Sequence, residues 1–285
     1  MHESPALQDF EDLPSATAIE AEHLLYCAGE PHPMDLERGE AHCSCDRCSR
    51  WDRFVRGEEP GGWPRYEVLT SELVAGLAAW LRGVAASSSR SLASPLRVLE
   101  VGAGDGRLTQ WLKRALAHCP VLLVATDSFA CGLRAVAPVE ALDYHAALAR
   151  ESPHVVLCCW MPLGQDWSLA MRAAHSVTHY VLVGEVDDGC CGQPWGTWGY
   201  IAGDDGSCSV SSTSSDSSDG GGEAEGEAWR RVYVNRPQST PWGAEGWSRC
   251  ELDQLSALQI CRTDTPWCAT RHSRTTVFTR GSPLE

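Results

Sequence analysis

Three closely spaced glycines follow a short apolar run in residues 96–108 (LRVLEVGAGDGRL). The apolar run predicts a buried strand formed by Leu96, Val98, Leu99 and Val101. The glycines after it allow a tight turn whose backbone approaches a ligand closely. Residues 107–117 then continue with apolar side chains at helical spacing. In a doubly wound α/β sheet, a strand, a glycine turn and a helix in this order form the site for a nucleotide-like cofactor.

The segments that follow repeat the alternation of strands and helices. Residues 121–126 form a continuous apolar run, as a parallel strand buried on both faces requires. Further strands are predicted at residues 139–143, 154–160 and 179–185, with helical or turn segments between them. This series predicts an α/β fold with a doubly wound, mostly parallel sheet.

The spacing of the glycines narrows the choice of cofactor. A dinucleotide fingerprint, G-x-G-x-x-G, needs its third glycine at position 107, where this chain has Arg107. The chain instead reads E-x-G-x-G-x-G from Glu100 to Gly106. This pattern resembles motif I of the class I S-adenosylmethionine-dependent methyltransferases, and the resemblance extends over roughly residues 64–281. It implies S-adenosyl-L-methionine as the cofactor and methyl transfer as the activity.

The resemblance also implies a complete sheet. Methyltransferases of this class have seven strands, and the last strand is antiparallel to the others. A helix at residues 66–81, ended by Gly83, would precede the first strand. A helix at residues 251–258 would precede a hairpin made of the sixth and seventh strands, at residues 258–262 and 275–280.

Cofactor-binding residues follow from the same resemblance. The methionine end would be held by Glu100, Gly102, Ala103, Gly104 and Gly106. Asp127 stands at the end of the second strand, where an acid accepts hydrogen bonds from ribose hydroxyls, although dinucleotide enzymes place an acid there too. Asp143 and Tyr144 would lie at the adenine edge, with a solvated loop aspartate as the alternative for Asp143.

Methyl transfer needs a positioned acceptor more than a reactive side chain. The acceptor is expected outside the ends of the fourth and fifth strands, next to Trp160. Trp160 either faces a cationic group through a cation–π contact or packs beneath the loop. A base is needed for a hydroxyl or protonated amine acceptor, and the candidates are His145, Asp166 and Glu185. Each of these three also fits a structural or solvated position.

A cysteine cluster near the amino terminus suggests metal chemistry. Cys43, Cys45 and Cys48 fall within six residues, among 14 cysteines in the chain. Cys27, or in its place His32 or His42, would complete four zinc ligands. A redox-sensitive thiol cluster and unligated cysteines are the alternatives.

Charge and composition restrict partners and domain organisation. The net charge is −15, which argues against general binding of the nucleic-acid backbone and favours a small-molecule or protein acceptor. Residues 204–228 are rich in Ser, Gly and acidic residues and are predicted to be disordered. They divide a methyltransferase-like domain into residues 63–203 and 229–285, preceded by an acidic, irregular N-terminal extension at residues 1–62.

The composition also bears on location. There is no long apolar run and no secretory signal, so we expect a soluble cytoplasmic protein with no membrane partner, the nucleus being the alternative.

Two other functions remain open at the level of sequence. A catalytically inactive methyltransferase-like scaffold would use the same fold, the cysteine cluster and the acidic segment to bind proteins. A nicotinamide-dependent oxidoreductase would need the glycine that Arg107 replaces.

Overall fold

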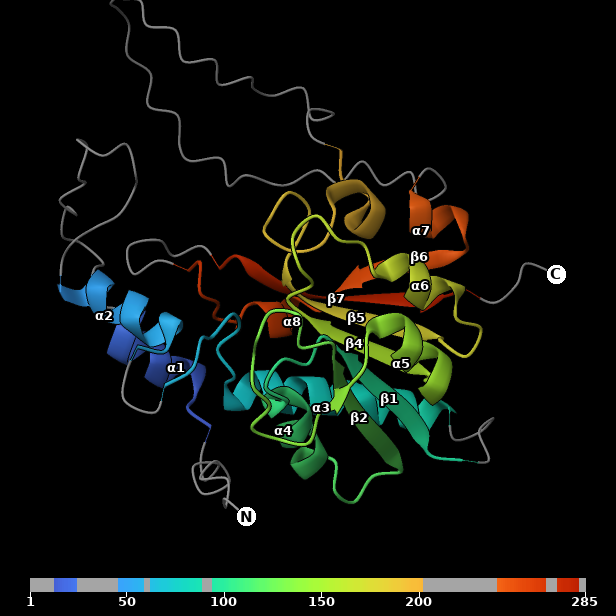
Figure 1. The fold of residues 1–285 in the computed structure, drawn as a ribbon, viewed down its shortest axis with the longest axis horizontal. Helices are drawn as coiled ribbons and strands as arrows, with labels where there is room; N and C mark the ends of the chain where they lie inside the picture. The colour runs from blue at the N-terminus through green and yellow to red at the C-terminus, as the bar shows by residue number, and fades with distance from the viewer. Residues whose placement is uncertain are drawn as a thin grey trace, which may run out of the picture.

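A seven-stranded sheet forms the centre of the protein in the computed structural model (Figure 1). The structure describes residues 13–24, 46–58, 62–88, 94–201, 240–264 and 271–281. The strand order is β3-β2-β1-β4-β5-β7-β6. The strands are β1 (Leu96–Val101), β2 (Val121–Asp127), β3 (Glu140–Ala141), β4 (Val155–Cys159), β5 (His179–Glu185), β6 (Trp247–Glu251) and β7 (Ser273–Arg280). Strands β1 to β5 pair in parallel, while β7 pairs antiparallel with both β5 and β6. The predicted doubly wound sheet with a reversed last strand is therefore confirmed.

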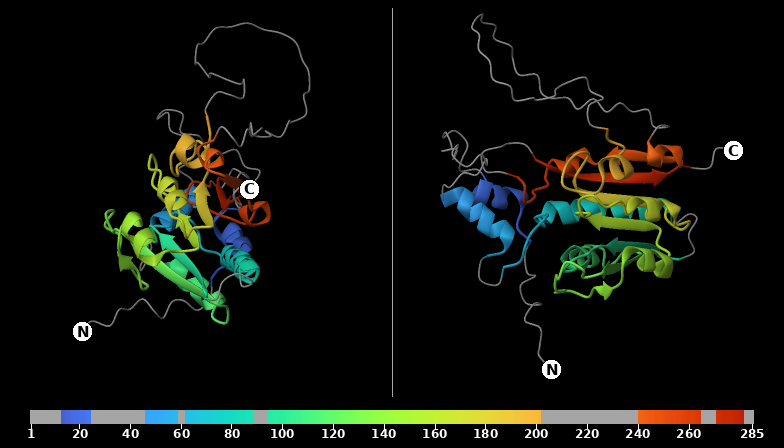
Figure 2. Two further views of the ribbon diagram at one scale, coloured as in Figure 1. Left: turned by 90° about the vertical axis from the view of Figure 1, so that its right-hand side faces the viewer. Right: turned by 45° about the horizontal axis from the view of Figure 1, so that its top comes forward.

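Helices cover both faces of the sheet (Figure 2). On one face, α3 (Ser71–Ser88), α4 (Arg107–Ala115) and α8 (Asp253–Ser256) contribute to an apolar core. On the other face lie α5 (Tyr144–Glu151), α6 (Ser168–Ala173), the π-helical turn η4 (Pro194–Trp198) and α7 (Pro241–Ala244). Strand β1 contributes side chains to the cores on both faces, because Val98 packs in the first core and its neighbour Leu99 in the second. Two-sided burial explains why the central strands are continuously apolar.

The N-terminal helices form a smaller unit beside the sheet (Figure 1). This unit comprises α1 (Ala16–Ile19), the π-helical turn η2 (Glu20–Leu24) and α2 (Asp46–Arg56). Its apolar cluster includes Trp51 and Phe54 and extends to Val68 and Ile260 in the main domain. The indole N–H of Trp51 donates to the carbonyl oxygen of Asp264 at 2.7 Å. The unit is thereby fixed next to Asp264.

The helix predicted at residues 66–81 begins and ends later than expected. It is α3, which starts at Ser71, because residues before it are extended and Glu67 forms a β-bridge with Cys261. The Thr70 hydroxyl accepts the N–H of Leu73 and caps the helix. Gly83 is exposed and does not end α3, since buried Val84 and Ala85 after it hold the last turns on the core.

The predicted sixth strand was assigned to the wrong segment. The observed β6 is Trp247–Glu251, and the helix predicted at residues 251–258 is reduced to α8. Residues 258–262 contain buried Ile260 and Cys261, but these join the N-terminal cluster and the bridge to Glu67 instead of the sheet. Apolar content alone does not reveal which neighbour buries a short segment.

Three further expectations concern the insertion, the N-terminal extension and the absence of a membrane-spanning segment. Residues 204–228 lie outside the described residues, as does most of the N-terminal extension. Within the part of the chain that the structure describes, no helix combines the length and the apolar character needed to cross a bilayer.

Candidate functional site

The glycine turn after β1 adopts a conformation that few other residues reach. Gly102, Gly104 and Gly106 have φ angles of 65°, 56° and 83°, in the left-handed region. A Cβ at Gly104 would meet only the side chain of Leu133, at 3.4 Å. The turn thus keeps its backbone uncovered at Gly104, and Gly106 is the N-cap residue of α4. Backbone N–H groups at a helix start attract polar or anionic ligand groups.

Asp127 ties this turn to the end of β2. Its Oδ2 accepts the N–H of Gly104 at 2.8 Å, and its Oδ1 accepts the N–H of Phe129 at 2.6 Å. The N–H of Ala103 donates to the carbonyl oxygen of Thr126 at 3.0 Å. The carboxylate predicted to meet a ribose is therefore next to the glycine turn, where it also fixes the shape of that turn.

Glu100 supports the turn from inside the protein. Its side chain is buried, and Oε2 accepts the N–H of Thr109 in the first turn of α4 at 3.1 Å. Burial raises the pKa of Glu100 to about 7, despite hydrogen bonds from Thr109 that act in the opposite direction. In the described contacts, Glu100 holds the start of α4 against the end of β1.

Arg107 shows what replaces the third glycine of a dinucleotide fingerprint. Its guanidinium pairs with Asp105 at 2.8 Å and lies 3.3 Å from the ring centroid of Trp63. The segment that precedes α3 is therefore attached to the start of α4 by a cation–π contact.

An aromatic pair covers the other side of the turn. Trp167 precedes α6, and a Cβ at Gly102 would lie 2.8 Å from its ring. The ring stacks on Tyr144, with centroids 5.0 Å apart and an interplanar angle of 17°. Tyr144 was named from the sequence, whereas Trp167 was missed because its only signal was its position after the fourth strand.

Asp143 and His145 flank Tyr144 at the start of α5. Oδ1 of Asp143 caps this helix by accepting the N–H groups of His145 and Ala146. The exposed His145 lies against the Tyr144 ring, with centroids 4.2 Å apart. A groove of about 730 Å³ between α5 and α6 is lined in part by Tyr144, His145 and Asp166. Asp166 itself accepts the N–H of Ser168 and the hydroxyl of Thr197, so its role in the described structure is to hold two segments together.

Trp160 joins a buried polar cluster at the end of β4. Its φ is +60°, an uncommon value for a bulky residue, and its indole N–H donates to Oε2 of Glu67 at 2.9 Å. The same oxygen accepts the Ser273 hydroxyl at 2.7 Å, and Gln259 donates to Oε1 at 3.1 Å. Burial raises the pKa of Glu67 to about 7, and the three hydrogen bonds lower it in part. Sequence reasoning missed Glu67, which follows no motif.

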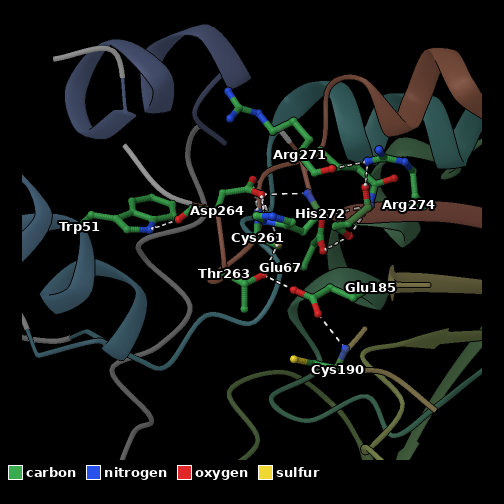
Figure 3. Close-up of polar contacts among 12 residues, drawn as sticks. Trp51, Glu67, Glu185, Cys190, Cys261, Thr263, Asp264, Arg271, His272 and Arg274 are labelled. Carbon is green, nitrogen blue, oxygen red and sulfur yellow. Dashed lines mark hydrogen bonds and ion pairs between the residues drawn. The ribbon is translucent and has the colours of Figure 1, made fainter. Parts of the chain in front are cut away.

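Glu185 ends β5 on the same edge of the sheet (Figure 3). It accepts the Thr263 hydroxyl and, at 2.7 Å, the N–H of Cys190. Burial acts to raise the pKa of Glu185, but these hydrogen bonds and nearby His272 hold it below its ordinary value. Among the described contacts, Trp160 and Glu185 thus belong to one polar region that includes His272, whereas His145 lies with Tyr144.

The proposed zinc ligands are largely outside the structure. Cys27, Cys43 and Cys45 fall outside the described residues, and Cys48 is buried in α2. Within residues 13–24, 46–58, 62–88, 94–201, 240–264 and 271–281, no group of three or more His, Cys, Asp or Glu side chains is arranged to hold a metal ion.

Comparison with solved structures returned methyltransferases. The chain is similar to the DszA carbon methyltransferase (12% identity, 73% of this chain and 54% of that one, TM-score 0.37). It is also similar to the citrinin polyketide synthase CMeT domain (14%, 72% and 53%, TM-score 0.35). A third match is an S-adenosylmethionine-dependent methyltransferase from Agrobacterium tumefaciens (14%, 41% and 45%, TM-score 0.28). The chain thus spans about half the length of each. No family model and no curated protein matches it.

The sheet itself defines the fold class. Its strand order and its antiparallel β7 are those of the class I methyltransferase-like fold that the sequence predicts. Function has to be argued from the site, because one fold supports many activities.

Proposed function

We propose that this protein transfers a methyl group from S-adenosyl-L-methionine to a small-molecule or protein acceptor. The observation that carries the proposal is the left-handed glycine turn anchored to Asp127. It lies where the chain order of the sheet reverses, since β1 is flanked by β2 on one side and β4 on the other. Ligands of open α/β sheets bind at this switch point.

The residues around the turn fit an adenosine linked to an amino acid. The uncovered backbone at Gly104 accommodates the polar methionine end, and Asp127 provides a carboxylate for ribose hydroxyls. Tyr144 and Trp167 provide an apolar, aromatic wall for a purine ring. S-adenosylmethionine, when bound, supplies an electrophilic methyl group. The protein's part is to orient an acceptor and exclude water.

The acceptor would approach over the ends of β4 and β5. Trp160 and Glu185 end these strands, and Glu67 connects Trp160 to the start of β7. Tyr66 extends this aromatic surface, with its ring centroid 5.6 Å from that of Trp160. The ends of β4 and β5 thus carry both apolar and polar groups, as a binding site for an organic acceptor requires.

Calorimetric titration with S-adenosylmethionine and S-adenosylhomocysteine tests the proposal. We expect both ligands to bind with micromolar dissociation constants, because the adenosine and amino-acid parts that the turn holds are common to both. A parallel titration with reduced nicotinamide dinucleotide should give no heat of binding. If a folded sample binds neither adenosyl ligand, methyl transfer is excluded and the scaffold function is favoured.

Replacing Asp127 by Ala should weaken binding of S-adenosylhomocysteine by roughly 2 kcal/mol, about 30-fold. The change removes a charged acceptor for the ribose and also frees the N–H groups of Gly104 and Phe129. Calorimetry measures the affinity, and a thermal melt reports the cost to the fold. Asp52→Ala serves as the comparison, since its exposed carboxylate pairs with Arg56 in α2, outside the proposed site. An Asp127 variant with wild-type affinity would show that the ribose is bound elsewhere.

A further inference from the structure

A buried aspartate, Asp264, connects Cys261 to His272, the residue before β7 (Figure 3). The side chain of Asp264 is fully buried. It accepts the N–H of Cys261 through Oδ2 and the N–H of His272 through Oδ1, both at 3.0 Å. The backbone carbonyl of Asp264 accepts the Trp51 indole N–H, which connects it to the N-terminal unit. Burying a carboxylate is costly, and these partners keep it in one orientation.

The imidazole of His272 faces this aspartate with one nitrogen only. Nδ1 is buried and lies 3.2 Å from Oδ1 of Asp264, an ion-pair contact rather than an aligned hydrogen bond. The side chain as a whole is 37% exposed, so the exposed area belongs to other atoms of the side chain. An imidazole that directs Nδ1 to a carboxylate has Nε2 available on its other side, and the carboxylate fixes the orientation of the ring.

His272 lies next to the ends of the strands where the acceptor is expected. It immediately precedes Ser273, the first residue of β7, which pairs with Glu185 at the end of β5. The Ser273 hydroxyl also donates to Glu67, which accepts the indole N–H of Trp160 at the end of β4. His272 is therefore adjacent to the residue that links both strand ends, and its charge acts on Glu185 at the end of β5.

The other carboxylates of this region are poorly suited to accept a proton from a substrate. Glu185 already accepts hydrogen bonds from Thr263 and Cys190, and its pKa is held below the ordinary value. Glu67 is buried and accepts hydrogen bonds from Trp160, Ser273 and Gln259. Both carboxylates are therefore engaged by hydrogen bonds within the protein. An imidazole is the side chain that most often serves as a general base.

We propose that His272 is the general base for methyl transfer, oriented by Asp264, and that the acceptor is a hydroxyl, thiol or protonated amine that must lose a proton. The inference rests on the proposed function. In the step, the acceptor heteroatom forms a bond to the transferred methyl carbon. The carbon–sulfur bond breaks and leaves its electron pair on sulfur. The acceptor proton passes to Nε2 of His272, and the imidazolium beside Asp264 then releases it to solvent.

The charge difference between two ligands tests whether His272 lies close to the transferred methyl group, without knowledge of the acceptor. S-adenosylmethionine carries a sulfonium charge that S-adenosylhomocysteine lacks, and the two are otherwise nearly alike. A protonated imidazole close to the methyl group disfavours the sulfonium, so the ratio of the two dissociation constants depends on pH. At separations near 7 Å the effect is roughly threefold to fiftyfold, depending on the local dielectric constant.

The experiment is calorimetry of both ligands at about pH 5.5 and pH 8 with wild-type protein and with His272→Gln. We expect S-adenosylmethionine to lose about tenfold more affinity than S-adenosylhomocysteine at the lower pH in wild type, and most of this difference to disappear in the variant. Glu67 and Glu100, with pKa values near 7, titrate in the same interval. The decisive quantity is therefore the difference in pH dependence between wild type and His272→Gln, and not the wild-type pH dependence alone.

Two controls separate the outcomes. His118→Gln, in an exposed residue between α4 and β2 at the opposite edge of the sheet, should behave as wild type. His272→Asn provides a second test if the Gln variant is poorly folded in a thermal melt. If both ligands bind but the ratio changes with pH equally in wild type and His272 variants, or if His145→Gln removes the change instead, His272 is not the base. If neither ligand binds to wild type, the proposed function itself fails.

Discussion

Replacing Gly104 by Val is expected to reduce the affinity for S-adenosylmethionine more than 100-fold while the protein remains folded. The backbone of Gly104 has φ near 56°, and a Cβ there would meet only Leu133, at 3.4 Å. A branched side chain would therefore extend over the open face of the turn, where the proposed cofactor must contact the backbone. The left-handed conformation adds roughly 1–2 kcal/mol of strain. Calorimetry gives the loss of affinity, and thermal denaturation gives the cost to the fold.

A second glycine provides a matched control for this strain. Gly246 precedes β6, has φ near 80°, and a Cβ there would have no neighbour within 4 Å. Gly246→Val should cost similar stability and leave ligand affinity unchanged. Equal affinities of the two variants would contradict the placement of the cofactor over Gly104. Loss of the folded state in Gly104→Val alone would show that the turn is a structural requirement of the fold.

Contacts that are local in sequence explain why the glycine turn and Asp127 could be predicted to lie together. The glycine turn follows β1 directly, and Asp127 ends the next strand, so periodicity and turn chemistry place both at one edge of the sheet. Asp143 was expected at the adenine edge or as a solvated loop residue, and its observed role as the N-cap of α5 was not predicted. What the pattern did not show is that both oxygens of Asp127 already accept hydrogen bonds from the backbone.

The polar cluster around Glu67 could not be predicted, because segments distant in sequence build it. Glu67 and Ser273 are 206 residues apart in sequence, and Trp160 and Glu67 are 93 residues apart. No motif marks Glu67, Asp264 or His272. Glu67 was assigned to a helix, and Asp264 and His272 fall between the last two predicted strands. The sixth strand was misplaced for a related reason, since burial of Ile260 by the N-terminal helices gives it the same apolar signal as a strand.

Replacing Glu100 by Gln should stabilise the protein at pH 8 by roughly 1–3 kcal/mol and by less than about 1 kcal/mol at pH 5. The pKa of Glu100 is raised to about 7 in the folded state, from an ordinary value of 4.5. Between these values the folded protein holds a proton that the unfolded chain has released. Stability therefore falls as pH rises from 4.5 to 7, and the full cost, roughly 3 kcal/mol, is present above pH 7.

Glutamine avoids this cost because it is neutral at every pH and its amide oxygen still accepts the N–H of Thr109. Urea denaturation of wild type and variant at both pH values gives the two differences in unfolding free energy. Glu67 has a similarly raised pKa but is present in both proteins, so its contribution cancels.

Glu72 provides a control for which the opposite change in stability is expected. Burial acts to raise the pKa of Glu72, but hydrogen bonds from the Ala16 N–H and the Ser71 hydroxyl hold it below its ordinary value. Glu72→Gln should therefore lower stability at pH 8, where Glu100→Gln raises it. If Glu100→Gln changes the unfolding free energy equally at pH 5 and pH 8, Glu100 titrates as an ordinary carboxyl group. Burial of Glu100 would then not lower the free energy of unfolding at neutral pH.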